Sequence, residues 1–104
     1  MNNYFEYDER LGIRLPLISG HWEQYEPETQ ESILLEWEKI RGIIPDRIKE
    51  LEIVINKKQA MLENEDNFHE SCCLNKEIAD LASTINDLWI WYRTNGEVSV
   101  KHHH

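Results

Sequence analysis

The chain has 104 residues, of which 30% are charged and 40% are hydrophobic, and its formal net charge is −9. This length allows one domain with a modest core. The negative charge argues against nucleic acid or an anionic membrane as a partner. No apolar run reaches the roughly 18 residues of a membrane span, and no signal peptide is evident. Cys72 and Cys73 are adjacent and cannot easily bond to each other in a helix, so we expect a reduced, cytoplasmic protein.

Residues 1–26 are the least regular part of the sequence, and we expect them to form an extended arm. Apolar residues alternate along part of this arm, at Leu11, Ile13, Leu15 and Leu17. Gly12 and Pro16 interrupt the alternation, and a proline removes a hydrogen-bond donor from a strand ladder. The arm is therefore expected to lay apolar side chains over the helices without joining a sheet.

The first of three predicted helices begins at Pro27, because proline is well tolerated at the first helical position. Its apolar face should consist of Ile33, Leu34, Trp37 and Ile40. Gly42 and Pro45 are expected to end or kink this helix, since the residue before a proline is pushed out of the helical region. The helix would then fold back across the end of the other two.

The second and third helices, residues 45–63 and 67–94, should form an antiparallel hairpin because only a short polar link separates them. Apolar residues at alternating three- and four-residue spacing predict the hairpin core. That core is Ile48, Leu51, Ile55, Ile78, Leu81 and Ile85. The expected fold is all-α and three-helix bundle-like, with a helical domain at 27–96. Residues 97–104 are expected to form a disordered tail that ends in Lys101 to His104, which resembles the start of a purification tag.

Near its end the third helix becomes apolar on every side, at Leu88, Trp89, Ile90, Trp91 and Tyr92. At 1.5 Å per residue it would be roughly 42 Å long against roughly 27 Å for the second helix, so these aromatic turns would overhang. We take the five residues and Trp37 as the predicted interaction site. A homodimer with its axis near Trp91 would bury them. The alternative is that the N-terminal arm seals this end within one chain.

Acidic residues are concentrated in the first third of the chain. Residues 1–38 contain nine acidic and two basic residues, whereas residues 39–101 contain eleven and nine. One acidic cluster has no Lys or Arg within it and consists of Glu23, Glu26, Glu28, Glu31, Glu36 and Glu38. Two interpretations are open. The cluster is either a solvated surface that keeps the chain soluble, or a docking surface for a basic protein, as in an inhibitor or immunity-type protein.

Few residues are arranged for catalysis or metal binding. His69 and Cys73 share one helix face, with Cys72 and Glu70 nearby, but zinc requires three or four converging ligands. The sequence has no glycine-rich phosphate loop, and His21 is the only other histidine outside the C-terminal tag-like residues. We therefore expect no metal, no cofactor and no enzymatic activity. The predicted function is a non-catalytic protein-interaction or regulatory module that self-associates.

Residues 48–92 loosely resemble the small sporulation-response aspartyl phosphatases, which are helical hairpins with a Ser-x-x-x-Asp signature on the second helix. Ser83 and Asp87 have the same spacing. The Gln-Glu-Leu interior of that signature is absent here, and aromatic residues follow where the family has polar ones. The resemblance covers less than half of the chain. It implies a phosphatase of this type as a further alternative function.

Overall fold

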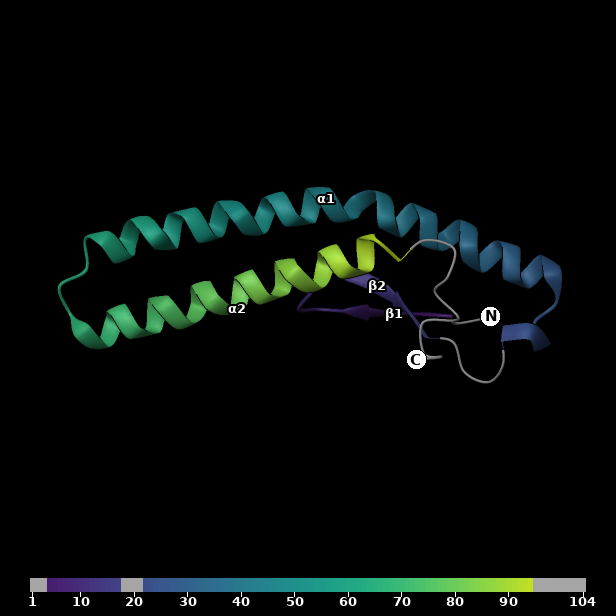
Figure 1. The fold of residues 1–104 in the computed structure, drawn as a ribbon, viewed down its shortest axis with the longest axis horizontal. Helices are drawn as coiled ribbons and strands as arrows, with labels where there is room; N and C mark the ends of the chain where they lie inside the picture. The colour runs from purple at the N-terminus through teal and green to yellow at the C-terminus, as the bar shows by residue number, and fades with distance from the viewer. Residues whose placement is uncertain (1–3, 18–21, 95–104) are drawn as a thin grey trace.

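The computed structural model describes residues 4–17 and 22–94. In chain order these residues form strands β1 (Phe5–Asp8) and β2 (Ile13–Pro16), a short 3-10 helix η1 (Trp22–Gln24), and helices α1 (Pro27–Glu63) and α2 (Phe68–Tyr92). The two long helices pack as an antiparallel hairpin, and a two-stranded β-hairpin lies beside them (Figure 1). The protein is therefore mostly helical, as predicted, but it has two long helices and not three. The predicted end of the helical domain at residue 96 and the tail at 97–104 lie outside the described residues.

The predicted break between the first and second helices is wrong, because α1 continues through Pro45 as one helix of 37 residues. A proline within a helix cannot donate to the carbonyl four residues earlier, here that of Arg41. The helix nevertheless continues, because Ile40, Ile44 and Ile48 follow one another at four-residue spacing and are all buried. Only a continuous helix places all three on one side. Figure 1 shows α1 as a single ribbon that bends near its middle.

The length of α1 also overturns the predicted overhang of the third helix. At 1.5 Å per residue, α1 is about 55 Å long and α2 about 38 Å. The first half of α1 does not fold back but runs on beyond the C-terminal end of α2 (Figure 1). The aromatic turns of α2 therefore lie against α1 and do not project past it.

The N-terminal arm contains a β-hairpin, so the expectation that it joins no sheet is wrong. β1 and β2 pair in antiparallel register, with Asp8 opposite Ile13. The Asp8 carboxylate accepts the backbone N–H of Leu11 at 2.9 Å, and the Asp8 carbonyl accepts that of Gly12 at 2.7 Å. Pro16 is the last residue of β2, where a missing backbone donor is tolerated. The aspartate thus closes a turn that the alternation of apolar residues does not reveal.

The hydrophobic core lies where the β-hairpin meets α1 and the C-terminal end of α2. Its buried members are Phe5, Leu11, Ile13, Ile33, Trp37, Ile40, Ile44, Ile48, Leu51 and Leu88. The expectation that the arm covers the helices with apolar side chains is therefore confirmed. Of the other residues predicted for the hairpin core, Leu81 and Ile85 are partly buried and pack against this cluster. Ile55 and Ile78 are partly buried farther along the two helices.

Two polar details of the helical hairpin follow from the sequence. The side chain of Asn67 accepts the backbone N–H of Glu70 at 3.0 Å and so caps the first turn of α2. Nζ of Lys58 on α1 lies 2.9 Å from Oε1 of Glu77 on α2, an ion pair between the two helices. The start of α2 and the antiparallel pairing are therefore as predicted.

Gly12 provides a test of the β-turn. Its φ is +77°, and a Cβ added there would lie 2.4 Å from Nε of Arg47. We expect Gly12→Ala to lower the free energy of unfolding by about 1–3 kcal/mol, because a side chain at positive φ is strained. Urea denaturation at a fixed protein concentration measures the change.

Gly42→Ala is the matched control, since Gly42 lies within α1 and an added Cβ would meet nothing within 4 Å. An alanine inside a helix should raise the free energy of unfolding by about 0.5–1 kcal/mol. If both variants were as stable as the wild type, the described turn at Gly12 would be incorrect.

Candidate interaction surface

Two of the six predicted interaction residues lie in the core of the single chain. Trp37 and Leu88 are both 0% exposed. The indole N–H of Trp37 donates to the carbonyl of Thr94, and its ring packs edge-on against Trp91, with 5.7 Å between ring centroids. Trp91 is itself half-buried. The side chains that the sequence suggested as a dimer contact thus pack largely on one another within one chain.

Arg41 on α1 holds the last turn of α2. Its guanidinium lies over the ring of Tyr92, 5.1 Å from the centroid, and its Nε donates to the Tyr92 carbonyl at 2.8 Å. The last carbonyls of a helix have no partner within it and carry partial negative charge. Arg41 and the Trp37 indole supply donors from α1 to this end of α2. The predicted site therefore has a structural role in joining the two helices.

The remaining two predicted residues keep substantial surface. Trp89 is 38% exposed and Ile90 is 45% exposed. Trp89 packs edge-on against Tyr92, with centroids 5.5 Å apart. Within the predicted site, Trp89 and Ile90 are therefore the residues best placed to meet another molecule, while the homodimer itself stays a prediction.

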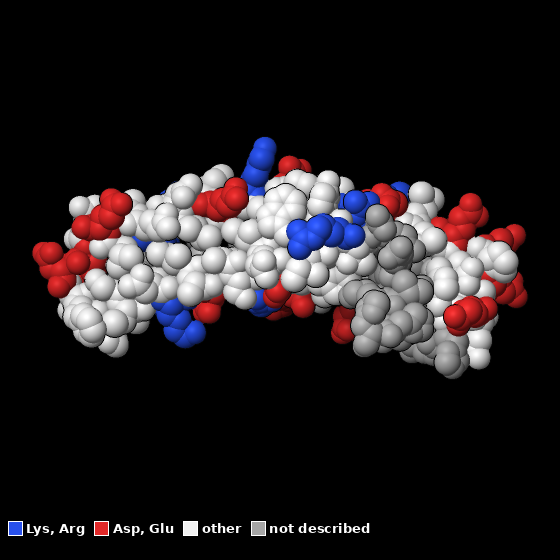
Figure 2. Space-filling view, viewed as in Figure 1, with Lys and Arg blue, Asp and Glu red and all other residues white. Residues whose placement is uncertain are grey.

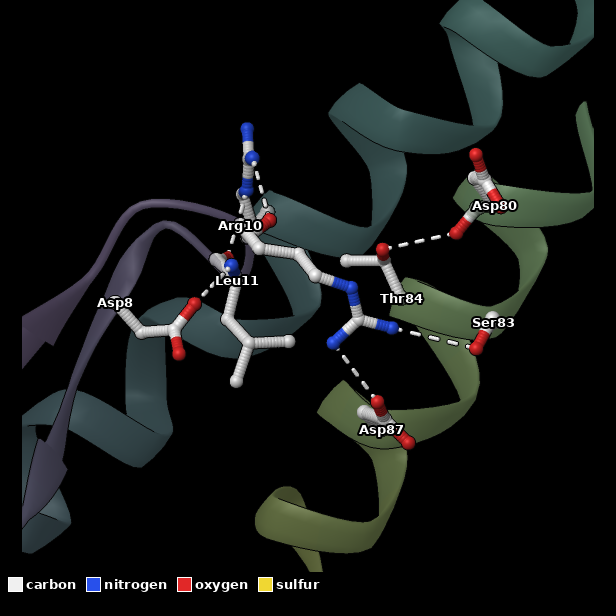
Figure 3. Close-up of polar contacts among 8 residues, drawn as sticks. Asp8, Arg10, Leu11, Asp80, Ser83, Thr84 and Asp87 are labelled. Carbon is white, nitrogen blue, oxygen red and sulfur yellow. Dashed lines mark hydrogen bonds and ion pairs between the residues drawn. The ribbon is translucent and has the colours of Figure 1, made fainter. Parts of the chain in front are cut away.

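Arg10, in the turn of the β-hairpin, contacts α2 (Figure 3). Its Nη1 lies 2.9 Å from Oδ2 of Asp87, and its Nη2 donates to Oγ of Ser83 at 3.3 Å. From the other helix, Nε of Arg47 donates to the carbonyl of Leu11 at 2.9 Å. The two arginines hold the turn between α1 and α2. Ser83 and Asp87, the pair with the Ser-x-x-x-Asp spacing, are the residues on α2 that Arg10 contacts.

Sequence reasoning did not identify Arg10 as an anchor. Residues 10 and 87 are far apart in the chain, and an arginine in a polar turn looks like any solvated side chain. The turn that Asp8 closes and Arg47 contacts places Arg10 beside α2. Because this ion pair is half-exposed, its contribution to stability is modest, about 0–1 kcal/mol. Its importance lies in the position that it gives to the hairpin.

Within residues 4–17 and 22–94, no three His, Cys, Asp or Glu side chains converge to hold a metal ion. Nε2 of His69 and Sγ of Cys73 lie 4.0 Å apart, and both residues are exposed on α2. In the same described ranges, no helix is both long and apolar enough to cross a membrane. His21 lies outside the described residues.

One groove lies between the β-hairpin and the start of α1. It has a volume of about 460 Å³ and is lined in part by Tyr4, Arg14, Glu28 and Glu36. Arg14 pairs with Glu36 across the groove, and its guanidinium lies 5.6 Å from the centroid of the Phe5 ring. The Arg14 guanidinium is therefore already in contact with the Glu36 carboxylate and the Phe5 ring.

The acidic cluster divides into paired and unpaired parts. Glu36 and Glu38 form ion pairs with Arg14 and Arg41. Four other members near the start of α1 are exposed and have no salt bridge among the described residues: Glu23, Glu26, Glu28 and Glu31. Figure 2 shows acidic side chains gathered at this end of the molecule. The predicted acidic docking surface is thus smaller than the sequence suggested.

No protein-family model, curated protein or solved structure matches this chain. The functional interpretation therefore depends on the surfaces of the described residues. These surfaces include exposed apolar side chains along α2 and the acidic end of α1.

The core assignment predicts different costs for two leucines. Leu88→Ala should lower the free energy of unfolding by about 2–5 kcal/mol, because the side chain is fully buried beside the β-hairpin. Leu35→Ala serves as the control, since Leu35 is 61% exposed on α1 and should change stability by less than about 0.5 kcal/mol. Thermal and urea unfolding followed by circular dichroism measure both. Equal effects would contradict the placement of Leu88.

Proposed function

We propose that this protein is a non-catalytic helical module that acts through protein–protein contact and self-associates. The observation that carries the proposal is the set of large apolar side chains exposed along α2. Phe68 is 82% exposed, and Trp89 and Ile90 also keep much of their surface. Burying apolar surface is favourable by roughly 25 cal/mol per Å². A complex in which a partner covers these side chains would therefore be stabilised.

The polar contacts support an interaction role over a catalytic one. Arg10, Arg14 and Lys58 are each paired with a carboxylate within the chain. Two helices lying side by side also have little depth in which to enclose a substrate. The same thinness leaves much of each helix available to another protein.

Sedimentation equilibrium over a range of protein concentrations tests the proposal. We expect a mass twice that of the single chain at micromolar concentration. Because the proposed contact is apolar, raising the salt concentration should not weaken it. A protein that remains a monomer at high micromolar concentration would contradict self-association.

The exposed acidic end of α1 favours a second candidate function, the binding of a basic protein by an inhibitor or immunity-type chain. Four exposed glutamates lie there and none has a salt bridge among the described residues. Opposite charge would speed the encounter with a basic surface, and salt would slow it.

Two double variants with the same change in net charge test this candidate. Glu28→Lys with Glu31→Lys reverses the proposed surface, whereas Glu63→Lys with Asp66→Lys reverses charges at the opposite end of α1 and in the link. Association rates with a captured basic partner are measured by surface plasmon resonance at several salt concentrations. Only the first pair should slow association. Equal slowing by both would indicate a general effect of net charge.

A further inference from the structure

A second heptad pattern runs along the outside of α2, about a third of a turn from the face that packs on α1. Its central positions repeat at alternating three- and four-residue spacing and are Cys72, Asn75, Ala79, Ala82, Asn86 and Trp89. All six are exposed. We call these six residues the outer seam. Such a repeat is the pattern by which one helix packs along another.

The outer seam carries no charged side chain, in a chain in which 30% of residues are charged. The exposed side of a surface helix is normally its charged side. Figure 2 shows the corresponding uncharged band along α2, with acidic and basic groups toward its edges. A basic protein would find no carboxylate here to bind. Two copies that each carry a charge of −9 repel one another, so an uncharged face suits their contact best.

The order of residues along the outer seam also favours a second copy. In an antiparallel pair of α2 helices with the two-fold axis midway between Ala79 and Ala82, Ala79 of one copy lies opposite Ala82 of the other. Asn75 then falls on Asn86, and Cys72 falls on Trp89. A two-fold contact requires a surface that matches itself in such an arrangement. The alanines at the centre allow close approach of the helices, and the asparagine amides can both donate and accept hydrogen bonds.

The same pairing continues to the ends of the helix. The next positions of the repeat are Phe68 at one end and Arg93 at the other. In the antiparallel pair, Phe68 of one copy lies opposite Arg93 of the other. Phe68 is the most exposed of the large apolar side chains on α2. An arginine guanidinium over an aromatic ring is a favourable contact, as Arg41 and Tyr92 show within the chain. Each end of the antiparallel pair would therefore gain one such contact.

We infer that two copies of this chain associate through their outer seams, with the α2 helices antiparallel and the two-fold axis between Ala79 and Ala82. The two helical hairpins then form a four-helix assembly. This inference rests on the proposed self-association and specifies its surface. It places the axis away from Trp91, which packs against Trp37 within the chain.

Disulfide trapping tests the register. Cys72 and Cys73 are first replaced by serine, and Asn75→Cys and Asn86→Cys are then made separately in that background. When the two variants are mixed and oxidised, the 75–86 disulfide should form between copies. Each variant alone should form little disulfide, because equivalent residues would lie about 16 Å apart along the axis, beyond the reach of a disulfide. Mass spectrometry identifies the linked peptides.

Ala82→Glu provides a second measurement that does not depend on cysteine chemistry. It places a carboxylate beside the axis in each copy, so the dissociation constant of the dimer should rise more than about 100-fold. Ala60→Glu is the control, since Ala60 is exposed on α1 outside the seam. Both variants should keep the wild-type helix content.

The outcomes separate this inference from the proposed function. A mixed disulfide together with loss of the dimer in Ala82→Glu supports the outer seam. A dimer that gives no mixed disulfide and tolerates Ala82→Glu would overturn the outer seam and leave self-association standing. A wild-type chain that is monomeric at high micromolar concentration would overturn both.

Discussion

The turn of the N-terminal β-hairpin is held between the two long helices, and this places Phe5, Leu11 and Ile13 in the same buried cluster as Trp37. Arg10 reaches Asp87 on α2, while Arg47 on α1 donates to the carbonyl of Leu11 in the turn. The hairpin then places apolar side chains over the first half of α1, beyond the point where α2 ends. Among the described residues, η1 and Tyr25 give this half of α1 only partial further cover. The hairpin thus allows a two-helix protein to have a fully buried core.

The sequence predicts the elements whose signals are local. The boundaries of α2 near Asn67 and the antiparallel pairing follow from a cap, a short link and a repeated spacing. The sequence does not predict that α1 continues through Pro45. The local effect of a proline, which is to break a helix, conflicts there with the burial of residues against other parts of the chain. The proline favours a break, but Ile44 and Ile48 are buried only when the helix continues. Burial outweighs the hydrogen bond that the proline removes.

The sequence does not predict the β-hairpin for a different reason. Its strands have four residues each, which is too short for alternation to be distinctive. The turn depends on the Asp8 side chain and on the positive φ of Gly12, and its position depends on Arg10. None of these features is visible as a periodic pattern. The sequence indicates that the aromatic end of α2 needs cover, and for Trp37 and Leu88 that cover comes from the chain itself.

The outer seam shows how one sequence pattern can conceal another. The outer seam and the face of α2 that packs on α1 both repeat at three- and four-residue steps, and the leucine and isoleucine residues of the α1-facing side dominate the pattern. The outer seam consists of small, polar and aromatic residues, so its regularity becomes evident only once the inner face has been assigned to α1. A thin hairpin with one face covered by α1 and a second, uncharged face in solvent is suited to further helix packing. This is the physical basis for the proposed interaction role.

Amide hydrogen exchange along α1 tests most directly whether the β-hairpin completes the core. The structure predicts slow exchange for residues 33–48, which are covered by the β-hairpin and the end of α2, and faster exchange for residues 55–62. Both segments belong to the same helix, so the comparison is internal. Slower exchange at residues 55–62 than around Trp37 would contradict the account.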